Sequence, residues 1–433
     1  MRVVSSFVFS AIGLSLCGQS ILSGPMPGYS ECLEGIIWLQ ADRACKASMM
    51  YWKESEPGNV RYSAEALAEA RNAFAVDLIA DQVEPGNTYR YRVLLDGKPV
   101  EVADTLRFHT QPLWKFRGDP PDFTLATGSC AYINETAYDR PGKPYGDGYG
   151  IFNSIADQHP DLMVWLGDNI YLREPDWGSW SGIMHRYTHT RSTPELQRLL
   201  RGTHHYAIWD DHDFGPNDAD ASFVNADLTR KAFDLFWPNP PCTAPGVGGI
   251  TTAFSYLDVD VFLLDDRSFR VPPEVVTDTA TMLGNAQIDW LIRALKYSDA
   301  TFKLVALGGQ FLNSAAVYET YSMYPRERQR IIDRITREGI KNVVFLTGDR
   351  HFSQLSKLVL SNGHALYDLT VSPFTSSVHP MKETNTLAVE GTYVAQRNFA
   401  MLRFSGPSAQ RKLTIEVHDV EGKPLWQRVI LAE

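Results

Sequence analysis

The chain has 433 residues, of which 44% are hydrophobic and 21% are charged, and its formal net charge is −10. This length predicts two domains rather than one, and the composition is typical of a soluble globular protein. The negative charge argues against nucleic acid or an anionic membrane as the main partner, because both carry the same sign of charge. A positive pocket can still attract an anionic substrate.

The N-terminus has the pattern of an export signal. An apolar run over 3–17 is too short to span a bilayer, so we expect a signal peptide over residues 1–24. The protein is then periplasmic, extracellular or a cell-surface lipoprotein. Cys17 is a candidate for a lipid anchor, and simple cleavage between residues 17 and 25 is the alternative. No later segment is apolar over the length that a transmembrane helix needs, so no transmembrane span is predicted.

Residues 25–112 are expected to form an all-β domain. Short runs with β-forming side chains predict its strands, at 36–40, 47–52, 74–79, 89–97 and 107–110. Strands of this size favour a sandwich of the fibronectin type III kind. Only 63–72 has the composition of a helix, and we expect it as an insertion between strands. For Cys32 and Cys45 a disulfide and two unpaired thiols are both open, because the sequence does not give their separation.

From residue 113 the pattern changes to strands that alternate with helices, which predicts an α/β domain over 113–433. Helices are predicted at 192–202, 285–298 and 325–339. The first of these has a cap at Thr193, a proline at its first position and a stop at Gly202. The tail is typical of a β-hairpin or of edge strands, at 398–406 and 412–431.

Five apolar runs in this domain stop abruptly at acidic, histidine or amide side chains. They occupy 162–171, 206–218, 259–270, 303–313 and 342–353. Unbroken apolar runs are typical of strands that are buried on both faces. Ligands collect at the carboxyl ends of such strands, and Asp, His and Asn side chains together can hold hard cations. The pattern predicts a hydrolytic metal enzyme.

Three residues are candidate ligands in such a pocket, namely Cys130, Asp168 and Tyr171. Cys130 follows an apolar strand and Gly128-Ser129, so it is either a buried inert thiol or a thiolate ligand. Asp168 directly follows a strand end and can bridge two ions. Tyr171, three residues on, is either a packing residue or a phenolate, and a phenolate requires a strongly Lewis-acidic ion.

The densest polar cluster follows the strand at 206–209. It contains Asp210, Asp211, His212, Asp213, Asn217 and Asp218. These groups repel one another unless cations or arginines neutralise them, and a solvated acidic loop is the alternative. In the last run, Asp349 and His351 alternate along the chain and can face one ion, while Arg350 points away or toward an anion. Asp265, Asp266 and Arg267 are expected to form an ion pair that supports the pocket.

These motifs together resemble a known family. The sequences GSC, GDNIY, WDDHD with ND, LDDR and TGDRH occur in this order after a fibronectin-like domain, as in the PhoD-like alkaline phosphatases. The resemblance covers roughly residues 30–430. It implies a four-layer αββα, calcineurin-like metallophosphatase domain with Fe³⁺ and Ca²⁺ at its centre. It also implies hydrolysis of phosphate mono- or diesters, with a small-molecule or lipid phosphate ester as substrate.

The resemblance also implies roles for single residues. Cys130, Asp168 and Tyr171 would bind the ferric ion, with Asp168 as the bridging ligand. Four further residues are candidates either for metal ligands or for phosphate contacts, and the resemblance does not say which role each has: Asp211, Asn217, Asp349 and His351. Arg350 would offset charge on the phosphoryl oxygens. His212 would either protonate the leaving group or orient Asp211.

Two rival functions are open. One is a metal-dependent carboxylic-ester or lactone hydrolase, which needs neither thiolate nor phenolate, so Cys130 and Tyr171 count against it. The other is a non-catalytic exported binding protein whose fibronectin-like domain does the binding. That protein would have no open coordination position at its metal site.

Overall fold

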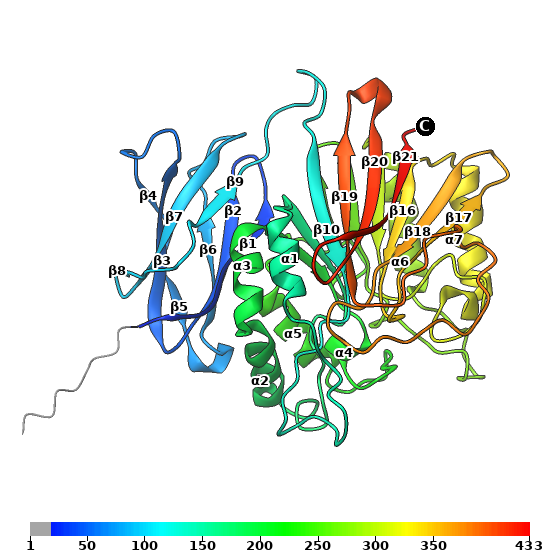
Figure 1. The fold of residues 1–433 in the computed structure, drawn as a ribbon, viewed down its shortest axis with the longest axis horizontal. Helices are drawn as coiled ribbons and strands as arrows, with labels where there is room; N and C mark the ends of the chain where they lie inside the picture. The colour runs from blue at the N-terminus through cyan, green and yellow to red at the C-terminus, as the bar shows by residue number, and fades with distance from the viewer. Residues whose placement is uncertain (1–18) are drawn as a thin grey trace, which may run out of the picture.

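The computed structural model describes residues 19–433 (Figure 1). Most of the predicted signal peptide, including Cys17, lies outside the described residues. The first strand, β1 (Ile21–Ser30), begins within the range predicted for that signal, so a mature chain that starts at residue 25 would lack part of this strand. Among the helices of residues 19–433, none is long and apolar enough to cross a membrane.

The N-terminal part is a sandwich of two antiparallel sheets. One sheet has the order β1-β2-β6, with β2 at Gly35–Ala41 and β6 at Ala75–Ala80. The other is built from β4 (Arg61–Tyr62), β3 (Cys45–Lys53), β7 (Thr88–Leu95) and β8 (Lys98–Pro99), with β5 (Ala66–Ala68) on β3 and β9 (Arg107–His109) on β7. All five predicted strands are confirmed, and their inward side chains form one apolar core between the sheets.

The helical expectation for 63–72 is wrong. The segment forms the short strand β5 and a single 3-10 turn, η1 (Ala70–Asn72). Ala68 pairs with Cys45 of β3, so the sheet satisfies backbone groups that a short isolated helix could not stabilise by itself. Cys45 and Cys32 are free thiols, as are Cys130 and Cys242. No disulfide joins the described cysteines.

The second part contains two six-stranded sheets. The first has the order β12 (His204–Ile208), β11 (Leu162–Leu166), β10 (Phe123–Gly128), β19 (Asn398–Ser405), β20 (Lys412–Asp419) and β21 (Pro424–Leu431). The second has the order β13 (Thr252–Tyr256), β14 (Val259–Leu263), β15 (Phe302–Ala306), β16 (Val343–Thr347), β18 (Ala365–Thr370) and β17 (Gln354–Val359). Strands β10, β11 and β12 are parallel, as are β14, β15, β16 and β18. Within each parallel group the carboxyl ends therefore share one edge.

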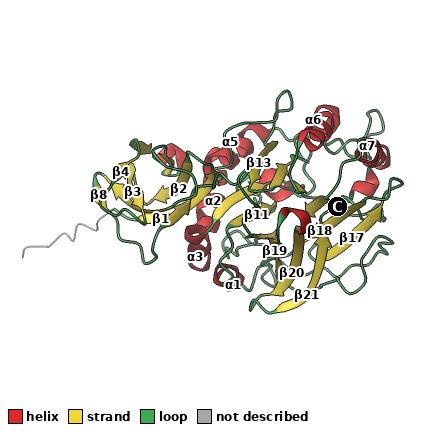
Figure 2. Ribbon diagram, turned by 90° about the horizontal axis from the view of Figure 1, so that it is seen from above, coloured by secondary structure: helices red, strands yellow, loops and turns green. Residues whose placement is uncertain are grey.

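Helices lie on the outer faces of both sheets, although the strands β20 and β21 of the first sheet have no helix over them (Figure 2). The first sheet is covered by helices packed into the largest core, α1 (Ile151–Asp157), α2 (Trp180–Arg191), α3 (Pro194–Gly202) and α5 (Ala226–Phe236). A separate core joins the second sheet to α6 (Gly284–Tyr297) and α7 (Pro325–Arg337). The short helices are α4 (Asp211–Phe214), η2 (Tyr321–Met323) and η3 (Ser408–Gln410). The three predicted helices are confirmed as α3, α6 and α7.

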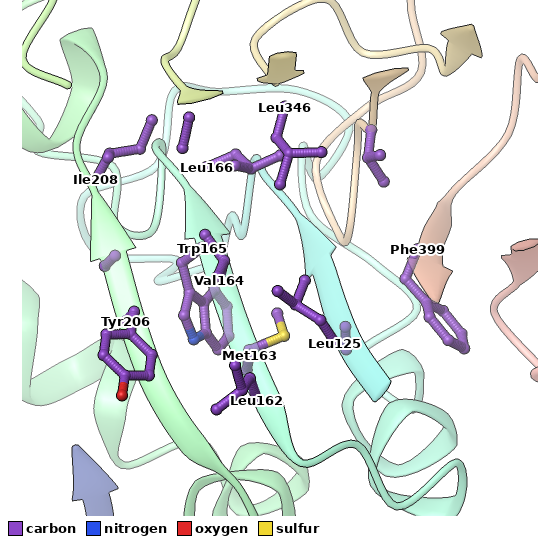
Figure 3. Close-up of a cluster of buried hydrophobic side chains, with 14 of the residues drawn as sticks. Leu125, Leu162, Met163, Val164, Trp165, Leu166, Tyr206, Ile208, Leu346 and Phe399 are labelled. Atoms are coloured by element: carbon purple, nitrogen blue, oxygen red, sulfur yellow. The ribbon is translucent and has the colours of Figure 1, made fainter. Parts of the chain in front are cut away.

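The two sheets pack face to face over an apolar layer. Figure 3 shows Leu166 of the first sheet beside Leu346 of the second, and both side chains are fully buried. Every residue of β11 and of β16 is buried, as the unbroken apolar runs predict. Each such leucine contributes roughly 1.5–3 kcal/mol to folding. This packing fixes the strand ends of both sheets relative to one another.

Candidate metal centre

The loops after β10 and β11 bring the first two site residues together. Gly128 pairs with Trp165 in parallel register, so both strands end at the same level. Beyond them, the Cys130 N–H donates to the Gly167 carbonyl (3.3 Å), and the next N–H donates to the Asp168 carbonyl (2.8 Å). As a result Sγ of Cys130 lies 3.6 Å from Oδ2 of Asp168.

The second sheet contributes to the same point. Sγ of Cys130 also lies 3.7 Å from the carbonyl oxygen of Asp349, and Ser372 donates a hydrogen bond to it at 3.1 Å. The sheets can approach this closely because residue 348 is glycine. A Cβ atom at Gly348 would lie 2.6 Å from Oγ of Ser129, which is shorter than any normal contact. The glycine of the TGDRH motif is therefore a packing requirement.

Four predicted ligands have a left-handed backbone. The φ angles are 62° at Cys130, 51° at Asp168, 63° at Asp349 and 56° at His351. Non-glycine residues rarely adopt this conformation, which costs roughly 1–3 kcal/mol each and tends to occur at functional sites. Strain at several adjoining strand ends indicates that the surrounding structure holds these side chains in place for a ligand.

One group of ligand atoms comprises Cys130, Asp168 and His351, and these atoms lie within 4.8 Å of one another. His351 donates from Nδ1 to the Ser377 carbonyl at 2.6 Å, which leaves Nε2 as the free ligand nitrogen. Tyr171 is buried in the same apolar pocket as Cys130, and its hydroxyl has no hydrogen-bond partner among the described residues.

Two further groups continue from the first. Asp168, Asp211 and His212 place their ligand atoms within 4.8 Å of one another, and so do Asp211, Asp218 and Glu319. Asp168 thus belongs to the first and second groups, as a bridging carboxylate must. Asp211 belongs to the second and third in the same way.

Two carboxylates of the densest cluster are engaged by protein groups. Asp210 accepts from the Asp211 N–H as the cap of α4, and Arg267 donates to it at 2.7 Å. Asp213 accepts from the backbone N–H groups of Asn169 and Ile170 at 3.1 and 3.3 Å. These two carboxylates therefore hold the loops in place, which leaves their neighbours for ligand binding.

The donor atoms fit a cation. Burial and the charge of Asp168 raise the pKa of the Cys130 thiol, and burial and the same charge raise the pKa of the Tyr171 hydroxyl. Burial and the charge of Asp211 raise the pKa of the Asp168 carboxyl. One oxygen of Asp211 is buried without a hydrogen-bond partner among the described residues. A bound cation removes each of these penalties, because it stabilises the deprotonated forms.

The centre lies at the floor of an open cavity of about 790 Å³. The predicted residues that line it are Asp168, Asp211, His212, Asn217, Asp349, Arg350 and His351. Cys130 and Tyr171 are buried beneath this surface. Asn217 is exposed on the cavity wall. The structure thus brings all nine predicted site residues to one place.

Arg350 is already engaged by protein groups. Its guanidinium donates to Gln310 and to Glu383, each at 2.6 Å. Arg267 donates to Asp210 and, at 3.0 Å, to Glu319. Its Nε atom also lies 3.8 Å from Asp266, so the predicted supporting ion pair is present within a larger network.

Comparison with known proteins identifies the family. The sequence pattern of the PhoD-like phosphatases matches residues 125–410. The chain belongs to this family. It is 25% identical over 340 residues to alkaline phosphatase D of Bacillus subtilis (strain 168), a match that covers 67% of this chain and 56% of that protein. The chain therefore matches little more than half of the length of this curated relative.

Solved structures agree on the fold. The structure of PhoD superposes with a TM-score of 0.75 at 20% identity and covers 94% of this chain and 88% of its own. Purple acid phosphatase PPD1 from yellow lupin (Lupinus luteus) seeds gives a TM-score of 0.71 at 11% identity, covering 94% and 74%. The fold is an N-terminal β-sandwich followed by an α/β metallophosphatase domain, as the motifs of this family predict.

Proposed function

We propose that this protein hydrolyses phosphate mono- or diesters in a metal-dependent reaction. One observation carries the proposal: two groups of ligand atoms share the carboxylate of Asp168 at the floor of an open cavity. Membership of a family of phosphoric ester hydrolases supports it. The rival ester or lactone hydrolase would not require the buried thiol and unpaired phenol beside that carboxylate.

The donor chemistry suggests which ions are bound. A thiol and a phenol that are both buried suit a strongly Lewis-acidic ion such as Fe³⁺, with Cys130, Asp168, Tyr171 and His351 as its ligands. Oxygen donors from Asp211, Asn217, Asp218 and Glu319 suit Ca²⁺. When bound, these ions supply positive charge that orients the phosphoryl oxygens and lowers the pKa of water.

The residues of the chain prepare the reaction. Asp168 and Asp211 hold the substrate-binding floor in a fixed geometry, and the His351 contact with Ser377 fixes its free nitrogen. Asp349 lines the wall of the same cavity. Arg350 is held by Glu383, so it supplies positive potential to the phosphoryl oxygens from a fixed position.

We propose that His212 transfers a proton to the leaving oxygen. Burial lowers the pKa of its imidazole, so this role becomes stronger as the pH falls. Its imidazole lines the cavity, and its ring centroid lies 4.3 Å from that of Tyr171, which fixes its orientation. A proton donor at this place lowers the barrier most for esters whose leaving group is a poor one.

We further propose that the protein is exported, with a signal peptide within residues 1–24. The β-sandwich and the metallophosphatase domain over 113–433 would then form the mature protein, and cleavage before Ile21 would leave strand β1 whole. The apolar run at 3–17 supports export.

The test is release of p-nitrophenol from its phosphate monoester and from its phosphate diester. Protein loaded with iron and calcium is assayed from neutral to alkaline pH, beside the same protein after chelation. Turnover of at least one ester that chelation abolishes supports the proposal. No turnover of either ester by fully loaded protein would refute it.

A further inference from the structure

The cavity has room for more than one phosphoryl group. At about 790 Å³ it has the size of a site for a larger organic ligand. Beyond the acidic floor its wall includes Pro272, Tyr318, Met323 and Phe352. This wall has the chemistry to contact the organic part of an ester.

Tyr318 is held outward by a strained turn. It lies on the loop between β15 and η2 with φ of 45°, and Glu319 after it has φ of 58°. The Glu319 carboxylate is drawn inward by Arg267 at 3.0 Å and by Arg270. Thr320 closes the turn by donating to the Ala315 carbonyl at 2.5 Å. Consequently Glu319 is buried, while Tyr318 beside it is 60% exposed.

Arg350 supports the ring of Tyr318 from one side. The centre of the guanidinium lies 5.1 Å from the centroid of that ring and 5.0 Å from the centroid of Phe352. Glu383 and Gln310 hold the same guanidinium by hydrogen bonds of 2.6 Å. Arg350 is thus a rigid support, and the exposed part of the tyrosine ring faces the cavity. A fixed aromatic face in this position suits stacking against a flat group.

We propose that Tyr318 forms a subsite for a planar aromatic group carried by the phosphate ester. The inference rests on the proposed function, because the phosphoryl group at the acidic floor positions the organic part beside this wall. Two sources share this chemistry, namely a nucleobase and a simple aryl group. Tyr318 is then a specificity-determining residue, and the reaction at phosphorus does not need it.

The direct test is equilibrium binding of two phosphonates that cannot be hydrolysed. Calorimetry with metal-loaded protein gives Kd for phenylphosphonate and for methylphosphonate. In the wild type we expect phenylphosphonate to bind about tenfold more tightly. Tyr318→Ala should reduce this preference to within about twofold, and Tyr318→Phe should keep it. Tyr297→Ala is the matched control, because that tyrosine is 93% exposed and does not line the cavity.

Two results would overturn the inference. One is an unchanged preference in Tyr318→Ala. The other is a full preference in Tyr318→Leu, because leucine keeps apolar contact without a flat ring. A second measurement distinguishes a nucleobase from a simple aryl group. Turnover of adenosine 5′-monophosphate and of phenyl phosphate is measured relative to turnover of glycerol phosphate. The substrate whose relative turnover falls more in Tyr318→Ala carries the group that the subsite binds. If loaded protein hydrolyses no ester but keeps the phosphonate preference, the proposed function fails and the subsite stands.

Discussion

Sγ of Cys130 lies 3.6 Å from Oδ2 of Asp168, although 38 positions separate them in the chain. The parallel register of β10 and β11 produces this contact, because both strands end at one level and both following loops turn through left-handed residues. Neither side chain would be stable in this pair as an anion without a cation. The contact therefore links the fold directly to metal binding.

Asp168→Asn should lower both metal content and turnover. The substitution removes the carboxylate that two ligand groups share. We expect a loss in rate that exceeds the roughly 10- to 100-fold typical of residues that only support ligands. Elemental analysis and p-nitrophenyl phosphate turnover measure the two effects.

Asp266→Asn is the control for that variant. Asp266 is equally buried, but it accepts from the backbone N–H groups of Gly308 and Gly309 at 2.8 and 3.2 Å. The Asp266→Asn variant should keep its metals and lose less activity than Asp168→Asn. Full metal content in Asp168→Asn together with metal loss in Asp266→Asn would show that different strand ends form the site.

Removing the metals should destabilise the wild type. The buried carboxylates of Asp168, Asp211 and Asp349 would then repel one another at neutral pH. If the ions had been present at about 100 times Kd, chelation should lower the free energy of unfolding by about 3 kcal/mol. Denaturant unfolding with and without chelator measures this. Because Asp168→Asn relieves part of the repulsion, chelation should affect it less, and an equal effect would contradict the argument.

His212→Gln should slow the reaction by roughly 10²- to 10⁴-fold for alkyl phosphates. The loss should be smaller for p-nitrophenyl phosphate, because nitrophenolate leaves without a proton. Metal analysis runs in parallel, since a ring nitrogen of His212 lies within 4.8 Å of ligand atoms of Asp168 and Asp211. Equal losses for both kinds of ester, with metal loss, would make His212 a ligand rather than a proton donor.

The contact between the sandwich and the second domain should be acid-sensitive. His204 donates from Nδ1 to the Gly28 carbonyl at 2.8 Å and accepts at Nε2 from the His109 N–H at 3.1 Å, so it must be neutral. Burial lowers its pKa to about 4. The unfolded chain has a histidine pKa near 6.5. The stability from neutral His204 is therefore present above about pH 6.5 and is lost as pH falls through about 4, on the order of 3 kcal/mol.

His204→Gln tests this effect. Glutamine can make both hydrogen bonds and does not titrate, so the acid unfolding midpoint should move to lower pH. His159→Gln is the control, because His159 is exposed. Circular dichroism against pH gives both midpoints. Identical midpoints in the wild type and His204→Gln would show that this histidine does not contribute.

The positions of the buried strands and most residues of the metal centre can be predicted from the sequence. Runs such as 162–166 and 343–347 are buried on both faces, so their apolar pattern predicts them directly. Cys130 and Asp168 each follow such a run by no more than two residues. Strand β1 has no such pattern: it carries two glycines and two prolines, and bulges interrupt its pairing with β2.

Residues that reach the metal centre only through tertiary contacts have no recognisable pattern in the sequence. Glu319 reaches the centre only because Arg267 and Arg270 hold it. Tyr145 and His379 belong to loops far apart in the chain. At the cavity wall the Tyr145 hydroxyl lies 3.4 Å from Nε2 of His379. The acidic cluster at 210–218 is recognisable in the sequence. The sequence does not show that Asp210 caps the single turn of α4 while Asp211 lines the cavity.

The visible spectrum and metal content of the purified wild-type protein test most directly whether Cys130 and Tyr171 bind iron. Thiolate and phenolate ligands to oxidised iron give charge-transfer absorption, whereas carboxylate and imidazole ligands alone do not. We predict a coloured, iron-containing protein whose absorption weakens in both Cys130→Ala and Tyr171→Phe. A colourless, iron-free wild-type protein with full phosphatase activity would contradict it.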